Sequence, residues 1–292
     1  ATNDGGCQVS LTGGNTWSSQ HTQKNAQHYR IATDNDFPYN VYGTCQDILS
    51  YKVPSASRWG GISRYETTIV GNGETGNAIP HPDKPHIVYT ISSGAPFGSG
   101  APFTVNDLNT GQCQIRPIWP DPMFGLNAYD LKYRFNWDTP FFISPHDSKT
   151  IYLGANVVFK TTDEGLNWEV ISPDLTNDIK DRQKITGTPW LSEYFGQEVY
   201  STIHRIDESP VKQGVIWTGS DDGKVYVTED GGTNWNDVSI KDAPKYSQIY
   251  EIEPSPHDAA TAYVAISNFN TDNDYNPYLY KTTDYGKTWT NL

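Results

Sequence analysis

The sequence predicts an all-β protein, a β-propeller of four-stranded antiparallel blades with about five and a half blades in this chain. Three observations predict it. A Ser/Thr-x-Asp-x-Gly-x-x-Trp phrase, called the box below, occurs three times in full. Each copy follows a strand-like alternation of apolar and polar residues, and a Ser-Pro phrase lies upstream of each copy. Repeats of roughly 45–65 residues, each with four strands, are typical of sheets arranged radially.

Each part of the repeat can be read from the sequence. The Ser-Pro phrases "SPHD" (144–147), "SPVK" (209–212) and "SPHD" (255–258) mark a turn that leads into a strand. The box then marks the turn between the third and fourth strands. Its copies are "TTDEGLNW" (161–168), "TEDGGTNW" (228–235) and "TTDYGKTW" (282–289). A fourth copy, "SLTGGNTW" (10–17), has Thr12 in place of the Asp.

This rhythm divides the chain into repeats. Residues 3–17 align without gaps to residues 221–235, so the chain opens within a repeat, at its third strand. Two further repeats lack the box, and "DLNTGQ" (107–112) takes its place in one of them. An unpaired half blade would expose a strand edge, so we expect upstream or partner strands to complete the ring and the chain to be part of a longer polypeptide. The single propeller region, 1–292, is predicted to contain a half blade at 1–20 and blades at about 27–58, 72–119, 138–172, 198–239 and 246–292.

The box is interpreted as architecture. An Asp side chain in a tight turn accepts hydrogen bonds from backbone N–H groups, and Gly supplies the positive φ that such turns need. The Trp begins the outer strand and can cover the turn. Because the carboxylate recurs once per blade and is used within its own turn, catalysis by it is not expected. The structural box residues are Asp163, Gly165, Trp168, Asp230, Gly232, Trp235, Asp284, Gly286 and Trp289.

Composition narrows the classes of partner. The net charge of −13 argues against nucleic-acid binding, and no apolar run is long enough for a membrane span. Cys7, Cys45 and Cys113 show no metal or redox spacing, so one disulfide with a free thiol and three buried thiols are both open. No metal or other cofactor is expected. The "TDNDYN" run (271–276) suggests at most an incidental Ca²⁺, since Pro277 stands where an EF-hand needs Gly.

The boxes resemble the Asp-box, or bacterial neuraminidase repeat, of sialidases, sortilin-type propellers and two-propeller xyloglucan hydrolases. Phrases such as "ISPHDSKTIYLGANVVFKTTDEGLNWEVISPDLT" are most similar to secreted bacterial sortilin-N-terminal-like proteins, often labelled glycosyl hydrolases. The resemblance implies a secreted, periplasmic or cell-surface protein. It does not by itself imply a chemistry, because many functions share one fold.

Three insertions are the candidate recognition loops. They cover residues 57–76, 120–140 and 173–198, and all are predicted to lie on the face opposite the box turns, where propellers usually bind ligands. Aromatic rings beside charged groups suit sugars, although the same rings could pack the insertions onto the blades. The candidate ligand-binding residues are Trp59, Arg64, Tyr133, Arg134, Trp137, Trp190 and Tyr194. The candidate catalytic carboxylates are Glu66, Asp130, Asp138 and Glu193.

The sequence therefore favours a secreted binding or interaction module for a glycan or protein partner. The alternative is a glycoside hydrolase that acts on an extracellular polysaccharide with an Asp/Glu pair on the insertion face. A scaffold within a larger assembly is a third possibility. A sialidase is disfavoured, because "YRIA" (29–32) has Ala32 where the family's Phe/Tyr-Arg-Ile-Pro motif has Pro.

Overall fold

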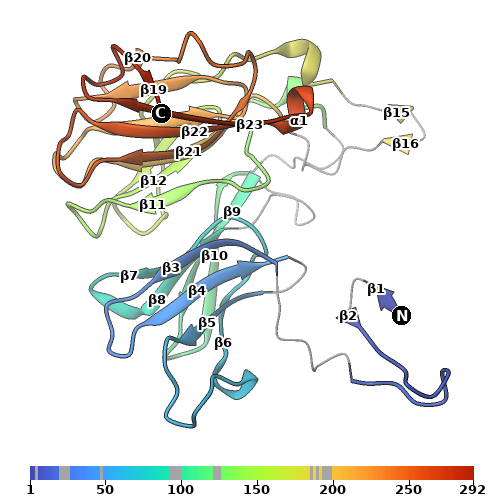
Figure 1. Ribbon diagram of the computed structural model, residues 1–292. Coiled ribbons are helices and arrows are strands. Elements are labelled where there is room, and N and C mark those ends of the chain that lie inside the picture. Colours follow the sequence, from blue (N-terminus) through green and yellow to red (C-terminus); the bar gives the residue numbers. More distant parts are fainter. Residues whose placement is uncertain are drawn as a thin grey trace.

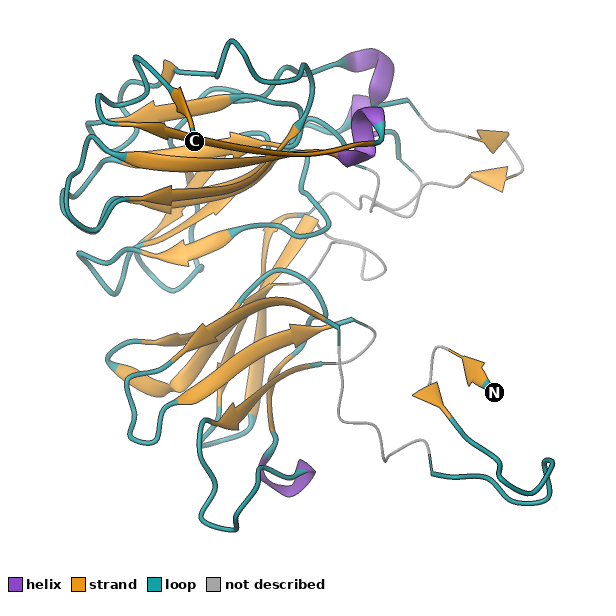
Figure 2. Cartoon of the chain, viewed as in Figure 1, coloured by secondary structure: helices purple, strands orange, loops and turns teal. Residues whose placement is uncertain are grey.

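The computed structural model describes residues 1–3, 6–19, 27–46, 49–91, 100–120, 126–184, 187–188, 191–192 and 199–292. It contains five sheets of four antiparallel strands each, here numbered blade 1 to blade 5 along the chain (Figures 1 and 2). The predicted all-β propeller is therefore confirmed. In every blade the strands follow the chain in order from one edge to the other, with no crossover.

The strands of the blades are short and rich in Val, Ile, Tyr and Thr, residues that suit a pleated, half-buried surface. Blade 1 contains β3 (His28–Thr33), β4 (Asn40–Cys45), β5 (Ser50–Pro54) and β6 (Thr68–Gly71). Blade 2 contains β7 (Ala78–His81), β8 (Lys84–Ile91), β9 (Gly100–Asp107) and β10 (Gln112–Trp119).

Blade 3 contains β11 (Phe141–Ile143), β12 (Ile151–Gly154), β13 (Val158–Thr161) and β14 (Glu169–Val170). Blade 4 contains β17 (Ile203–Glu208), β18 (Ile216–Ser220), β19 (Val225–Thr228) and β20 (Asn236–Asp237). Blade 5 contains β21 (Gln248–Pro254), β22 (Ala262–Asn268), β23 (Asp274–Thr282) and β24 (Thr290–Asn291).

The remaining elements lie outside the blades. Two short hairpins are formed by β1 (Thr2–Asn3) with β2 (Gly6–Cys7) and by β15 (Gly187–Thr188) with β16 (Leu191–Ser192). The helical turns are η2 (Arg64–Glu66), η3 (Ala128–Asp130), η4 (Lys180–Arg182) and α1 (Phe269–Asp272).

The up-and-down strand order fixes which loops share an end of the molecule. Connections from the first to the second strand and from the third to the fourth lie at one end, called the box end. Connections from the second to the third strand and from one blade to the next lie at the opposite end. The described parts of the second and third insertions, 126–140 and 173–184, lie between successive blades and therefore at the opposite end, as predicted.

The placement predicted for the first insertion is wrong. The segment 57–76 contains β6, the fourth strand of blade 1, so residues 55–67 connect the third strand to the fourth. That connection lies at the box end. Trp59, Arg64 and Glu66 are therefore on the face opposite to the one expected for them.

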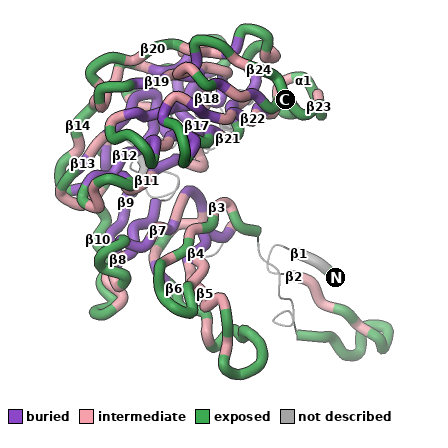
Figure 3. The backbone as a smooth tube through the Cα atoms, turned by 60° about the vertical axis from the view of Figure 1, so that its left-hand side comes forward, coloured by how far each residue is buried: buried purple, intermediate pink, exposed green. Residues whose placement is uncertain are grey.

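Neighbouring blades pack through apolar side chains. Tyr42 and Val70 of blade 1 meet Val88 of blade 2, and larger clusters join blade 2 to 3, 3 to 4 and 4 to 5. Among the described residues no apolar cluster joins blade 5 to blade 1, and the ion pair between Arg30 and Glu251, at 3.5 Å, spans that position. Figure 3 shows the buried residues concentrated in the upper blades and fewer of them in blade 1.

The box carboxylates hold their own turns. Asp163 accepts bonds from the backbone N–H of Asn167 at 2.9 Å, the Asn167 amide at 2.7 Å and the Thr161 hydroxyl at 2.8 Å. These bonds, the Asn167 amide first, lower the pKa of Asp163 to about 2. Asp230 and Asp284 repeat this pattern in their own blades. The three carboxylates thus act separately, each within one hairpin.

None of the three cysteines forms a disulfide in the structure. Cys45 is buried, Cys7 is half-buried and Cys113 is exposed. The sequence left two possibilities open, one disulfide with a free thiol or three buried thiols. Neither describes the structure fully, because only Cys45 is buried and no disulfide is present.

Candidate ligand-binding site at the centre of the blades

The first strands of three blades direct charged side chains toward a common centre. Arg30 lies on β3, Arg205 on β17 and Glu251 on β21. Each of these strands has a register shift at this point, between residues 28 and 31, 203 and 205, and 249 and 251. A β-bulge re-aims the side chain next to it. In blades 1, 4 and 5 the first strand therefore delivers one charged side chain to the centre.

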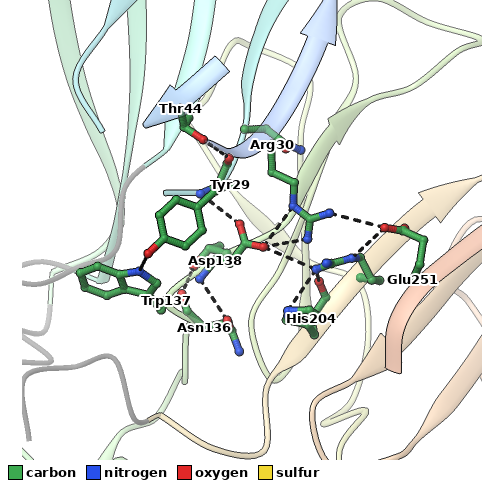
Figure 4. A network of polar contacts seen from close by, with 12 residues as sticks. Tyr29, Arg30, Thr44, Asn136, Trp137, Asp138, His204 and Glu251 are labelled. Carbon is green, nitrogen blue, oxygen red and sulfur yellow. Dashed lines mark hydrogen bonds and ion pairs between the residues drawn. The ribbon is translucent and has the colours of Figure 1, made fainter. Parts of the chain in front are cut away.

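Asp138, which lies just before β11, joins the two arginines (Figure 4). Its Oδ2 accepts bonds from Arg30 Nε at 3.0 Å and Arg30 Nη2 at 2.7 Å, and lies 3.6 Å from Arg205 Nη1. Its Oδ1 accepts a bond from the backbone N–H of Gly76 at 3.1 Å. Asp138 is thus held by blade 1, blade 4 and the segment before blade 2 together.

Glu251 closes the network on the other side. Its Oε2 lies 3.2 Å from Arg205 Nε and 3.5 Å from Arg30 Nη1. Its side chain is 46% exposed, whereas that of Arg205 is only 7% exposed. The network is called the central cluster and consists of Arg30, Asp138, Arg205 and Glu251. Its two cations and two anions balance, so it presents no net charge to a ligand.

Arg205 stays charged although it is buried. Burial, followed by the nearby charge of Arg30, lowers the pKa of Arg205 to about 10. This value is still well above neutral, so Arg205 stays protonated. Glu251 accepts the Arg205 Nε–H, and Asp138 lies within ion-pair distance of Nη1, so these contacts offset the cost of burying the guanidinium.

His204 is a neutral neighbour of this cluster. Its Nδ1 lies 3.0 Å from the carbonyl oxygen of Ile249, which assigns the ring proton to Nδ1. Its Nε2 is then an acceptor for Arg205 Nη1, at 3.1 Å. Burial, followed by the charge of Arg205, lowers the pKa of His204 to about 3. His204 therefore orients Arg205 and carries no charge at physiological pH.

Aromatic side chains flank the cluster on two sides. Tyr250, which is half exposed, lies with its ring 5.3 Å from the Arg205 guanidinium. On the other side Trp137 Nε1 donates to the Tyr29 hydroxyl at 2.9 Å, and that hydroxyl donates to Gln46. The rings of Tyr250 and Trp137 thus border the charged groups, an arrangement that suits the apolar face and hydroxyl edge of a sugar.

A cavity of about 490 Å³ opens beside the cluster at the opposite end. Asn136 connects the two, because its Oδ1 accepts the Asp138 N–H at 3.0 Å while Asn136 also lines the cavity. Amide and hydroxyl groups dominate the wall. The lining residues are Asn136, Arg182, Val199, Tyr200, Asp221, Gln248, Asn270 and Thr271.

Asp221 is the buried carboxyl group of this wall. It accepts bonds from the Thr202 N–H at 2.9 Å and the Thr202 hydroxyl at 2.7 Å, and the Asn136 amide lies 3.4 Å away. Burial, followed by the neighbouring charge of Asp222, raises the pKa of Asp221. The cavity therefore contains a carboxyl group that retains its proton at higher pH than an ordinary Asp.

Some residues of the second insertion pack against the protein, and others lie at the centre of the blades. Arg134 is buried and ion-paired with Asp174 at 2.7 Å and Asp178 at 3.1 Å, so it ties two insertions together. Tyr133 packs edge-on against Trp119 and is part of the apolar core. These two predicted ligand residues thus have structural partners, whereas Trp137 and Asp138 lie at the centre.

The other predicted residues lie elsewhere. Asp130 is exposed and accepts a bond from the Asn127 amide at 3.0 Å. Glu66 caps η2, where it accepts the Ser63 N–H at 3.1 Å, and Trp59 stacks with Arg58. Among the described residues, no two of the predicted catalytic carboxylates Glu66, Asp130 and Asp138 contact each other. Trp190, Glu193 and Tyr194 lie outside the described residues.

Sequence reasoning missed Arg30, Arg205 and Glu251 as site residues. A signal was available for two of them, because Arg205 and Glu251 each stand four residues before the serine of a Ser-Pro turn, Ser209 and Ser255. A charged residue that recurs at the same position of the first strand in several repeats is a candidate for the central site. The bulges that aim them there have no evident mark in the sequence.

Within the part of the chain that the structure describes, no group of three or more His, Cys, Asp and Glu side chains could hold a metal ion. No helix of the described ranges is long and apolar enough to cross a membrane.

Comparison with known proteins gives the fold and no closer relationship. No protein-family model matches the chain, and no curated protein matches it. Among solved structures, the chain is similar to the GH74 xyloglucanase from Xanthomonas campestris, with TM-score 0.55 and 16% identity over 87% of this chain and 36% of that one. The GH74 enzyme from Niastella koreensis gives TM-score 0.56 and 14% identity over 90% and 38%.

A third structure, the Cps50 (Swd1) β-propeller domain from Myceliophteria thermophila, gives TM-score 0.52 and 8% identity over 89% of this chain and 66% of that one. The chain thus spans just over a third of the length of the two GH74 chains. At these identities the likeness shows a β-propeller fold shared by proteins of different kinds.

Proposed function

We propose that this chain is a glycan-binding β-propeller module that holds a neutral sugar chain at the opposite end, over the central cluster. The observation that carries the proposal is the juxtaposition of a charge-balanced network, bordered by Tyr250 and Trp137, with a cavity walled by amides and hydroxyls. Such groups bond sugar hydroxyls, and aromatic faces pack on sugar C–H groups. An extracellular setting, expected from the sequence resemblance, belongs to the same proposal.

The absence of a net charge in the central cluster selects the class of ligand. An anionic ligand would have to displace Asp138 or Glu251 from the arginines, and each of these pairs is a short, partly buried ion pair. A neutral polyol can instead bond the exposed oxygens of Glu251 and leave the pairs intact. The likeness to GH74 structures supports a glycan as the ligand class.

A glycan array followed by calorimetry on the best ligand tests the proposal. Gln248 and Asn270 line the cavity, and neither side chain has a hydrogen-bond partner among the described residues. Gln248→Leu and Asn270→Leu are each expected to weaken binding about 10-fold, the loss of roughly 1.4 kcal/mol of hydrogen bonding. The control is Asn109→Leu, the same kind of change in an exposed turn at the box end. Equal effects of all three variants, or no binding on the array, would contradict the proposal.

Asp221 favours a second candidate function, glycoside hydrolysis. A general acid must keep its proton near neutral pH, and burial raises the pKa of this cavity carboxyl. Release of reducing ends from the bound glycan would then occur and be lost in Asp221→Asn. Binding without release, unchanged by Asp221→Asn, would leave the binding module as the function.

A further inference from the structure

Blade 1 has an uncovered apolar face. Ile31 pairs with Gly43, Gly43 with Tyr51, and Tyr51 with Ile69, so the side chains of these cross-strand partners lie on one face of the sheet. Tyr42, in the alternate register, faces blade 2. Ile31 is 70% exposed and Ile69 is 62% exposed. This face, called the free face, therefore looks away from blade 2 and carries large apolar groups in solvent.

The positions equivalent to Ile31 are buried in blades 4 and 5. Ile206 and Ile252, which directly follow the centre-facing Arg205 and Glu251 as Ile31 follows Arg30, are 7% and 2% exposed. Ile252 belongs to a cluster with Val225 and Val227, which lie on the third strand of the preceding blade. Between blades 4 and 5, the third strand of the preceding blade therefore covers the face that is exposed in blade 1.

The chain holds a hairpin of that kind at residues 6–18. Ser10 Oγ accepts the N–H groups of Thr12 at 3.3 Å and Gly14 at 2.7 Å, and Thr12 Oγ1 accepts the Thr16 N–H at 2.9 Å. The box of blade 4 makes the corresponding three bonds at 3.3, 3.0 and 2.9 Å. The hairpin thus has box geometry although it lacks the Asp.

The alignment assigns a face to each side chain of the hairpin. Cys7 and Val9 take the places of Val225 and Val227, the residues that cover the next blade. Val9 is 56% exposed in the structure, where the hairpin extends away from blade 1 (Figure 1). Residues 6–18 include no charged side chain, so covering them would desolvate no charge.

We propose that residues 6–18 pack on the outer half of the free face, with Cys7 and Val9 against Tyr51 and Ile69, as the outer hairpin of a further blade. Both partners are apolar, and burial of each large side chain favours the contact. The partner of the free face is thus this chain's own hairpin. Its position is inferred from the way the third strand of blade 4 packs on blade 5.

Hydrogen exchange on the full chain tests the contact. Val9→Asp would place a charge against the free face and is expected to speed amide exchange in β5 and β6 about 10-fold. Leu11→Asp is the matched control, because Leu11 takes the place of the exposed Glu229 and should leave exchange unchanged. Equal exchange in both variants and in the unsubstituted chain would overturn the proposal.

A disulfide trap gives a second measurement that does not depend on a buried charge. In a Cys113→Ser background, Ile69→Cys is expected to form a bond with the native Cys7 on mild oxidation, detected within one chain by peptide mapping. Thr68→Cys is the control, since Thr68 pairs with Lys52 and lies on the other face. At least 10-fold more cross-link is expected for Ile69→Cys. Similar yields in the two variants, or cross-links found only between two copies, would overturn the proposal.

Discussion

The indole Nε1 of Trp289 donates a hydrogen bond to the carbonyl oxygen of Val238, at 2.8 Å, and so joins blade 5 to the segment that follows blade 4. Trp235 makes the same bond to Ile171, at 2.9 Å, between blades 4 and 3. The box therefore does more than hold its own turn. In blades 4 and 5 its Trp also fastens the blade to the one before, which gives the Trp of the phrase a structural role.

Trp168 provides the contrast that tests this role. Blade 2 has no box, and among the described residues Trp168 Nε1 has no partner, although its ring packs edge-on against Phe103. Trp289→Phe should lose a hydrogen bond and leave the Val238 carbonyl unpaired, whereas Trp168→Phe loses no bond. We expect Trp289→Phe to lower the free energy of unfolding by about 1–2 kcal/mol more than Trp168→Phe, measured by urea denaturation. Equal losses would show that the bond adds nothing.

The second glycine of the blade 4 box is required because blades 3 and 4 lie too close together there for a side chain. A Cβ on Gly232, where φ is +102°, would lie 2.9 Å from the Ile171 carbonyl oxygen, while a Cβ on Gly231, where φ is +72°, would meet nothing within 4 Å. Gly231→Ala should cost only the strain of a positive φ, about 1 kcal/mol. Gly232→Ala should cost clearly more, since the interface must also open. Thermal unfolding of the two variants checks this, and a smaller loss for Gly232→Ala would contradict it.

Asp207 should make stability depend on pH in the neutral range. Burial, followed by the charges of Glu253 and Glu251, raises its pKa to about 7. A carboxyl group whose pKa is higher in the folded state than in the unfolded chain binds its proton more tightly when folded, so stability falls as pH rises from about 4 to about 7.

Asp207→Asn removes this dependence. Above pH 7 the variant is expected to be more stable than the unsubstituted chain by up to about 4 kcal/mol, the energy that corresponds to the pKa difference. Urea denaturation at several pH values between 4 and 8 measures it. Parallel curves for the two proteins would mean that Asp207 is ionised throughout in the folded state.

The box carboxylates should make stability rise with pH, in contrast to Asp207, and at lower pH. Hydrogen bonds lower the pKa of Asp163, Asp230 and Asp284, led by the side chain at the fourth position after each Asp. Their contribution to stability is therefore complete above about pH 4 and is lost as pH falls toward 2. Asp163→Asn should flatten the fall in stability over that range, as followed by circular dichroism. A fall as steep as in the unsubstituted chain would contradict this role for Asp163.

The sequence was sufficient for the blades that carry boxes, because box and Ser-Pro turns mark both ends of their strands. It was insufficient for β6, since blade 1 has no box and residues 55–67 separate its third strand from its fourth. Of the candidate site, Asp138 and Trp137 were found because they lie in an insertion. Arg30, Arg205 and Glu251 were missed because they sit on strands of ordinary pattern, and their convergence depends on bulges and on the closure of the blades around one axis.

The equivalent placement of Arg205 and Glu251 has a consequence for how such a molecule can change over evolutionary time. In blades 4 and 5 a single codon determines what the first strand contributes to the axis, while the neighbouring positions that hold the sheets together need not vary. Duplicating or exchanging a repeat would therefore rewrite the chemistry of the lumen one group at a time, with the surrounding scaffold left as it was.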